Sequence, residues 1–213
     1  MKKNILLLST GGTIASRPGK EGLAPQLGGG PLLRELGDGL NREYHFDCRD
    51  ILRMDSSNIQ PEQWQLIGGE IYRSLEDYDG IIVTHGTDTM AYTAAALSFM
   101  LQNLKKPIVL TGSQLPIGHL LTDARTNLYT AITAVEQDIK GVTVAFNRKI
   151  IRVTRAVKVS TMGFDAFDSV NVPCMGEIFA DGMRLRFSST HEIDPDRDTE
   201  LAENICPDVF LLK

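Results

Sequence analysis

Short apolar runs alternate with longer segments of helical periodicity, and this alternation constrains the fold more than any other feature of the sequence. Four runs have the length of a strand, are rich in Ile, Leu and Val, and lack polar alternation: Asn4–Leu8, Gly80–Thr84, Pro107–Thr111 and Val142–Phe146. Strands that are buried on both faces of a parallel sheet have this composition. We therefore predict an α/β fold, with an open, mostly parallel sheet and helices on both faces.

A fifth run, Tyr44–Leu52, differs because it begins with Tyr44, Phe46 and Cys48 on one face only. This alternation predicts a half-covered or edge strand.

Three segments have helical spacing. Proline suits a first helical position, so the first helix should begin at Pro61, and its apolar residues recur at helical intervals: Trp64, Ile67, Ile71, Leu75 and Tyr78. Met90–Leu101 is apolar nearly all round, which predicts a well-buried helix. A third helix can be capped by Thr122 or Asp123, and its apolar residues are Leu128, Ala131, Ile132 and Val135.

Charge and cysteine content exclude several classes of protein. The net charge of -5 disfavours a nucleic-acid partner, which requires a basic face. The 3 cysteines are far apart and predict neither a disulfide framework nor a zinc site, so a reducing, cytoplasmic compartment fits. The first apolar run stops at Leu8, too early for a signal peptide, and no later run is long enough to span a bilayer. We expect no membrane partner.

The apolar periodicity is lost between Ser188 and Pro207, where Ser, Thr, Asp, Glu and Pro predominate. We interpret residues 1–187 as the first domain and 188–207 as an exposed interdomain linker. Residues 208–213 have the signature of a buried strand, which we interpret as the truncated start of a second α/β domain, because a lone strand is not stable.

Polar loops follow three of the predicted inner strands: Ser9–Thr13, Thr84–Thr89 and Thr111–Gln114. The carboxyl ends of parallel strands line a common crevice, where ligands bind at a topological switch point. Glycines in these loops let backbone N–H groups turn toward a ligand, and a helix amino end favours negative charge. The loops thus predict a site for a small anionic or carbonyl-bearing molecule, with an oxyanion hole.

Each feature also has a structural explanation. Gly11–Gly12 can be a tight strand exit, Thr87 or Asp88 a helix cap, and Ser56–Ser57 a lead-in to the helix at Pro61. Lys158 follows Arg152 and Arg155, as in a solvated basic edge. Neither of the two common glycine-rich nucleotide-binding motifs occurs, and the 4 histidines are dispersed, so we expect no cofactor and no metal.

Three segments carry a resemblance to a known family. Thr10–Ala15, His85–Met90 and Thr111–Gln114 closely resemble the two signature segments and a substrate loop of the bacterial-type L-asparaginases. Met54–Ser57, Ala91–Met100 and Gly163–Phe167 are most similar to the cytoplasmic type I branch. The resemblance covers the chain from end to end and implies the amino-terminal domain of that family, with flavodoxin-like or Rossmann-like layering.

The resemblance implies a role for each matching position. Thr13 matches the nucleophile, whose hydroxyl attacks the side-chain amide of asparagine. Thr87, Asp88 and Lys158 match a second triad, in which the lysine activates the threonine or a water. The backbone amides of Thr13 and Thr87 would form the oxyanion hole. Ser56 and Asp88 correspond to groups that bind the ends of the substrate. Further substrate-binding candidates are Asp55, Gly86 and Ser113.

The resemblance further implies L-asparagine as substrate, with L-glutamine as a second amide, and a homo-oligomer, either dimer or tetramer, in the full-length form. Leu23 stands where many relatives have a loop tyrosine, so another tyrosine, a water or Lys158 would replace it. Because a neighbouring subunit's second domain completes the family's pocket, we expect weak or absent turnover by the 213-residue chain. The alternatives are the amidase subunit of a glutamyl-tRNA amidotransferase and a non-catalytic amino-acid-binding module.

Overall fold

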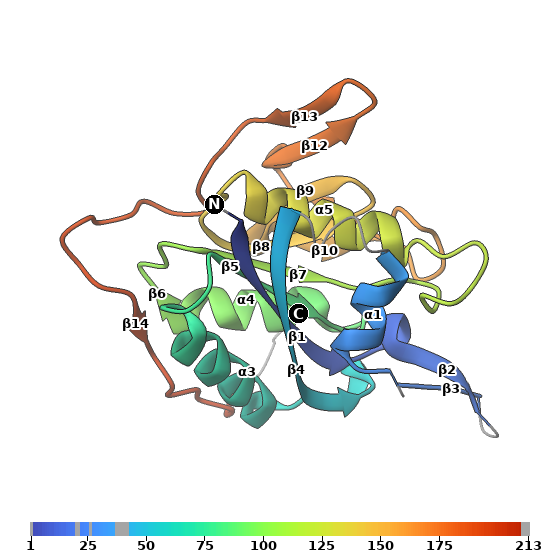
Figure 1. The fold of residues 1–213 in the computed structure, drawn as a ribbon. Helices are drawn as coiled ribbons and strands as arrows, with labels where there is room; N and C mark the ends of the chain where they lie inside the picture. Colours follow the sequence, from blue (N-terminus) through green and yellow to red (C-terminus); the bar gives the residue numbers. More distant parts are fainter. Residues whose placement is uncertain (1, 20–21, 26, 37–42, 210–213) are drawn as a thin grey trace.

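An eight-stranded sheet forms the centre of the molecule (Figure 1). The computed structural model describes residues 2–19, 22–25, 27–36 and 43–209, and for 18–19 and 22–25 it describes the backbone alone. The strand order is β13-β12-β9-β8-β7-β5-β1-β4. In chain order these strands are β1 (Lys3–Gly11), β4 (Tyr44–Met54), β5 (Gly80–Thr84), β7 (Pro107–Thr111), β8 (Gly141–Phe146), β9 (Lys149–Arg152), β12 (Gly176–Phe179) and β13 (Gly182–Leu185).

The first five of these strands are mutually parallel, whereas β9, β12 and β13 pair antiparallel. The four inner strands predicted from their apolar runs are confirmed, and β5 and β7 have the predicted bounds. β4 lies at the edge of the sheet and is buried on one side at its start, as its alternating pattern predicts.

Helices cover both faces of the sheet, and each face has its own apolar core. One core joins α3 (Pro61–Ser74) and α4 (Met90–Met100) to Leu6, Leu8 and Ile81. The other core joins α1 (Gly29–Leu36) and α5 (Ala124–Glu136) to Ile5, Leu7 and Ile82. Alternate residues of β1 thus point into opposite cores, as a strand buried on both faces requires. The predicted α/β fold class is confirmed.

The predicted helix from Met90 is confirmed as α4, but the prediction that it is well buried holds for one side only. Met90, Ala94 and Leu97 are buried against the sheet, but Tyr92 is 67% and Phe99 72% exposed. The described residues leave most of these two rings uncovered, whereas the stripe of α4 that faces the sheet is buried. The outer face of α4 is therefore exposed although its residues are apolar.

The two candidate capping residues of α5, Thr122 and Asp123, bind different partners. Thr122 Oγ1 accepts a hydrogen bond of 3.1 Å from the backbone N–H of Ala124, which satisfies one free donor at the helix start. The Asp123 carboxylate instead accepts hydrogen bonds from the backbone of Gln114 and Leu115. The helix start therefore holds the loop that follows β7.

Three small antiparallel pairs complete the described structure: β2 (Ser16–Gly19) with β3 (Gly22–Pro25), β10 (Ala156–Lys158) with β11 (Phe167–Ser169), and β6 (Leu101–Gln102) with β14 (Glu200–Leu201). Three short 3-10 turns occur at η1 (Thr13–Ala15), η2 (Ser56–Asn58) and η3 (Val153–Arg155).

Residues 188–207 run mostly exposed along the surface, where β14 pairs with β6 beside α3 and α4 (Figure 1). The Asn103 side chain holds this stretch in place, because its amide donates hydrogen bonds to the carbonyl oxygens of Asp194 and Arg197. The predicted strand at 208–213 lies largely outside the described residues, which end at Val209. In the part of the chain that is described, no helix is long and apolar enough to cross a membrane.

Candidate active site

The carboxyl ends of β1 and β5 lie side by side, and we call the place between the loops that follow them the crevice. These strands are neighbours in the sheet, yet β1 is followed by α1 on one face and β5 by α4 on the other. The chain therefore departs in opposite directions from two adjacent strand ends, which is the topological switch point where open α/β sheets bind ligands. The loops with Thr13 and Thr87 lie on its two sides.

Glycines let the loops at this crevice touch backbone to backbone. Gly12 has φ 77°, and a Cβ there would lie 2.4 Å from the backbone nitrogen of Gly86. A Cβ on Gly86 would lie 2.5 Å from Ser56 Oγ. Contacts this short exclude any side chain, so Gly12 and Gly86 bring the ends of β1, β4 and β5 together. Thr13, Ser56 and Thr87 are consequently carried on loops that pack against one another.

Two of the threonines in the polar loops are structural. Thr10 Oγ1 donates to the carbonyl of Thr84 at 2.8 Å, and Thr111 Oγ1 donates to that of Ala145 at 2.8 Å. Both hydroxyls are buried and join strand ends. Buried hydroxyls need such partners, so these two are not available for chemistry.

Lys158 joins the crevice from a distant part of the chain. Its Nζ donates to Thr87 Oγ1 at 2.8 Å and to Asp88 Oδ1 at 2.6 Å. The Lys158 side chain is only 14% exposed, although its neighbours in sequence suggested a solvated edge. Thr87 is 7% exposed. A cation and a hydroxyl thus meet in a largely buried place, while the Asp88 carboxylate that pairs with the cation is 61% exposed.

Thr13 lies at the start of η1, directly after Gly12, and is half-buried. Its hydroxyl makes no hydrogen bond to another described residue, whereas the neighbouring Ser16 hydroxyl donates to the carbonyl of Gly12 at 3.0 Å. Leu23 lies in the adjoining β3, but its side chain is outside the described residues.

The segment after β4 places Ser56 and Asp55 differently. Ser56 is buried against Gly86, and its carbonyl accepts a hydrogen bond of 2.7 Å from Thr89 Oγ1. Asp55 is exposed, and its carboxylate caps η2 by accepting from the backbone N–H of Ser57 at 2.8 Å. Ser56 therefore packs on the turn at Gly86, while Asp55 caps η2, a local role that the sequence interpretation did not consider.

The loop after β7 contains a residue that the sequence interpretation missed. The Ser113 hydroxyl is buried and donates to the Leu115 carbonyl within the loop. Its neighbour Gln114 reaches the crevice, because Gln114 Oε1 accepts from Thr87 Oγ1 at 3.2 Å. Gln114 belongs to the Thr111–Gln114 segment that was recognised, but nothing in the sequence distinguishes its side chain from that of Ser113.

His85 is completely buried beneath the loop that carries Thr87. Burial lowers the pKa of His85 to about 4, so its ring is neutral at neutral pH. Nδ1 lies 2.7 Å from the Gly86 carbonyl oxygen, which makes Nδ1 the protonated nitrogen. The ring supports the turn at Gly86.

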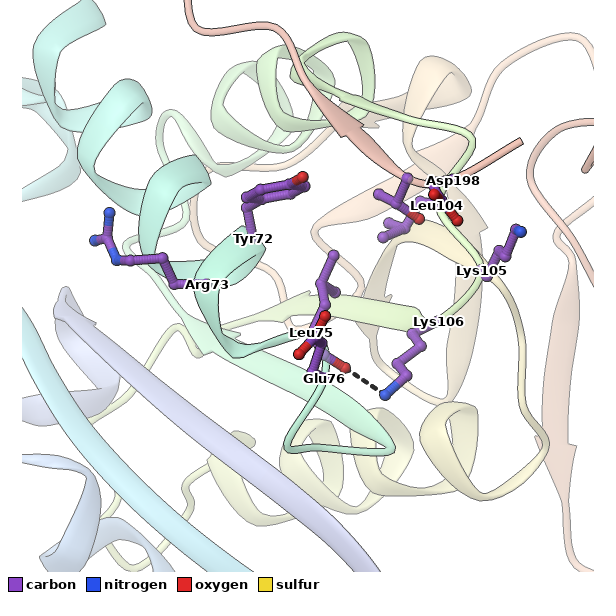
Figure 2. Close-up of a pocket in the computed structure, with 9 residues that line it drawn as sticks. Tyr72, Arg73, Leu75, Glu76, Leu104, Lys105, Lys106 and Asp198 are labelled. Atoms are coloured by element: carbon purple, nitrogen blue, oxygen red, sulfur yellow. Dashed lines mark hydrogen bonds between the residues drawn. The ribbon is translucent and has the colours of Figure 1, made fainter. Parts of the chain in front are cut away.

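No group of three or more His, Cys, Asp or Glu side chains in the described part of the chain could hold a metal ion. A cavity of about 540 Å³ lies away from the crevice, between the end of α3, residues 104–106 and residues 198–199 (Figure 2). There Lys106 Nζ donates to the carbonyl of Leu75 and, at 2.7 Å, to that of Tyr78, so it satisfies carbonyls at the end of α3. Residues 104–106 lead into the amino end of β7, whereas Thr87 follows the carboxyl end of β5.

Known proteins resemble this chain over most of its length. An L-asparaginase of Thermococcus kodakarensis is 43% identical over 182 residues, which cover 85% of this chain and 56% of that protein. L-asparaginase 1 of Escherichia coli K12 is 44% identical over 197 residues, which cover 89% of this chain and 56% of that protein. This chain thus spans little more than half the length of these curated relatives.

The solved structure of the thermostable L-asparaginase from Thermococcus kodakarensis has a TM-score of 0.86 and 40% identity to this chain, covering 96% of it and 61% of the solved chain. The family profile described as asparaginase, N-terminal, matches residues 4–192. The resemblance inferred from the signature segments is therefore confirmed, and this chain belongs to the asparaginase family, whose amino-terminal domain it contains.

Proposed function

We propose that this chain carries the amide-hydrolysing site of an L-asparaginase, which converts L-asparagine and water to L-aspartate and ammonia. The contact of Lys158 Nζ with both Thr87 Oγ1 and Asp88 Oδ1 is the observation that carries the proposal. The ammonium group of a solvent-exposed lysine is hydrated by water and does not require two such short hydrogen bonds to protein atoms. The names of the relatives support the same reaction.

In this mechanism Thr13 Oγ1 attacks the side-chain amide carbon of the substrate and forms a tetrahedral oxyanion. Backbone N–H groups of Thr13 and Thr87 bind that oxygen. The C–N bond then breaks, and nitrogen leaves as ammonia after taking up the proton released by the hydroxyl. Water attacks the resulting ester, which returns the Thr13 hydroxyl and releases aspartate.

Lys158, Thr87 and Asp88 transfer protons in these steps. The Thr87 hydroxyl and the Lys158 amino group pass the proton that the attacking oxygen releases to the leaving nitrogen. Asp88, 2.6 Å away, balances the positive charge of Lys158. Ser56 and Asp88 bind the carboxylate and ammonium ends of the substrate, with Gly86 and Ser113 shaping the backbone around it and Asp55 fixing the turn that presents Ser56.

L-Glutamine is a second substrate of this site, because one methylene usually changes the preference of a pocket by only about 1–3 kcal/mol. We further propose a cytoplasmic protein that acts as a dimer or tetramer in its full-length form. A solved neighbour named as a probable cytoplasmic L-asparaginase, from Campylobacter jejuni, supports the compartment.

Ammonia release from L-asparagine by the purified chain, together with thermal stabilisation by L-aspartate, tests this function. We expect a weak rate, because the chain spans 56% of its relatives, and a rise in melting temperature with ligand. Thr13→Ala and Lys158→Met should each abolish ammonia release while the ligand-induced rise persists.

Thr133→Ala and Lys140→Met are matched controls away from the crevice, and both should keep the original rate. A chain that neither releases ammonia nor is stabilised by L-aspartate would overturn the proposal. Stabilisation without any turnover, unaffected by Lys158→Met, would favour a non-catalytic amino-acid-binding module.

A further inference from the structure

Lys158 is the last residue of β10, one strand of a hairpin that lies outside the main sheet. The base of this hairpin is anchored in the core, because Phe167 pairs with Lys158 across the strands and packs on Phe146 with ring centroids 5.0 Å apart. Its tip, residues 159–164, is largely exposed, and Met162 is 89% exposed. Lys149 Nζ binds Asp165 at 2.8 Å just beyond the tip, so movement of this hairpin would be confined to the tip and would shift Lys158 beside it.

Gln114 holds the tip. Gln114 Nε2 donates to the carbonyls of Thr161 at 3.0 Å and Gly163 at 3.1 Å. Among the described residues, these are the hydrogen bonds that join 159–164 to anything outside the hairpin. The backbone N–H of Gln114 is itself bound by Asp123 at 3.0 Å, so the anchor rests on the rigid start of α5. Gln114 thus holds the hairpin on the side of the tip, in addition to the packing of Phe167 and the ion pair of Lys149 with Asp165.

The same side chain orients the Thr87 hydroxyl. The carbonyl oxygens of Thr161 and Gly163 accept the two N–H groups of the Gln114 amide. The amide oxygen Oε1 therefore faces Thr87. A hydroxyl has one hydrogen, and at rest it points to Oε1 while a lone pair accepts from Lys158 Nζ. One amide group therefore contacts both the tip of the hairpin that carries Lys158 and the hydroxyl of Thr87.

We propose that Gln114 is a positioning residue for the proposed hydrolysis, joining the hairpin tip to the loop after β7 and holding Thr87 Oγ1 toward Lys158. The inference rests on the proposed function and extends it to a residue that need not touch the substrate. Its contribution belongs to the proton-transfer steps and not to substrate binding. Misplacement of a catalytic group by about 1 Å can reduce a rate on the order of a hundredfold.

Two variants of the chain separate the contacts. Gln114→Leu removes the bonds to Thr87 and to the hairpin tip, whereas Gln114→Glu keeps an acceptor for Thr87 and loses both donors to the tip. Gln137→Leu, on the exposed end of α5, is the matched control. Hydrogen–deuterium exchange of peptides covering 159–166 and steady-state ammonia release are measured for each, with L-aspartate stabilisation as the test of folding and binding.

We expect exchange at the tip to accelerate about tenfold in both Gln114 variants, since each loses two hydrogen bonds there. In Gln114→Leu, kcat should fall at least about tenfold while KM changes less than about threefold. In Gln114→Glu, kcat should fall less, because Thr87 keeps an acceptor. Gln137→Leu should match the original chain in every measurement.

Unchanged exchange at the tip in both Gln114 variants would overturn the inference, whether or not the chain is active. Faster exchange with unchanged kcat would also overturn it, because the hydrogen bonds of Gln114 would then stabilise the hairpin without affecting catalysis. A third outcome is faster exchange in a chain that neither releases ammonia nor is stabilised by L-aspartate. That result would confirm that Gln114 holds the hairpin tip, and it would reject the proposed function instead.

Discussion

The two threonines of the crevice are presented in contrasting ways. Thr87 is almost completely buried, and its hydroxyl has a donor in Lys158 and an acceptor in Gln114. Thr13 is half-buried, and its hydroxyl has no hydrogen-bond partner among the described residues. One hydroxyl is fixed before any substrate arrives, and the other is free to meet one.

This difference suggests a division of labour. A group that relays protons benefits from fixed partners, because geometry decides the rate of transfer. A nucleophile must change its bonding during the reaction, so strong contacts in the resting state would oppose attack. The position of Thr13 depends instead on the backbone, because the preceding residue, Gly12, packs directly against Gly86. Three predictions test whether the Thr13 side depends on backbone fit and the Thr87 side on side-chain contacts.

The largest effect is expected at Gly12. Its φ of 77° and ψ of 179° belong to a region that is essentially restricted to glycine, and a Cβ would collide with the backbone of Gly86. Gly12→Ala should destabilise the chain by more than about 3 kcal/mol, measured by urea unfolding. Gly118→Ala, where a Cβ meets nothing within 4 Å, should change stability by less than about 0.5 kcal/mol. Equal stability of the two variants would contradict the backbone fit.

An intermediate effect concerns His85, below the Thr87 loop. Its pKa in the folded chain is about 4, against 6.5 for the ordinary side chain, so between these values the unfolded chain binds the proton more readily. Stability should therefore fall as the pH drops from 7 to 4, by up to about 3 kcal/mol from this group.

His85→Asn removes this titration and keeps a donor for the Gly86 carbonyl, so its stability should depend less on pH over the same range. The measurement is the free energy of unfolding in urea at pH 7 and pH 4 for both proteins. Identical pH dependence would show that His85 is not buried in its neutral form.

The smallest effect distinguishes the two hydroxyls directly. Thr87→Val removes an oxygen that binds Lys158 and Gln114, and it should lower the free energy of unfolding by about 1–2 kcal/mol. Thr13→Val removes an oxygen without a described partner, and the change should stay within about 0.5 kcal/mol. Thermal or urea unfolding of both variants at pH 7 measures the difference. A larger loss for Thr13→Val would reverse the comparison.

The sequence predicted the sheet well because strands buried on both faces consist of continuous apolar runs, as in Gly80–Thr84 and Pro107–Thr111. It placed the polar loops correctly at the carboxyl edge for the same reason. It failed on the outer face of α4, where Tyr92 and Phe99 are exposed, since composition does not reveal whether another layer exists.

The sequence also could not show which polar residues touch. Gln114 contacts backbone carbonyls nearly fifty residues further along the chain, and no periodicity encodes such a contact. Lys158 stands in a basic stretch that has the pattern of an exposed edge, and only its burial beside Thr87 and Asp88 distinguishes it. Resemblance to the family selected Lys158, whereas Gln114 is distinguished only by its contacts in the folded chain.

Because Lys158 lies 71 residues beyond Thr87, the amine and the hydroxyl are synthesised far apart in time. Domains fold from the amino end as the chain emerges from the ribosome, at about 5–20 residues per second. The crevice walls made by β1, β4, β5 and β7 can thus exist for several seconds before the hairpin that supplies the amine is available. A nascent chain would acquire its pocket first and its proton-transfer group last, so ligand binding should precede turnover during biosynthesis.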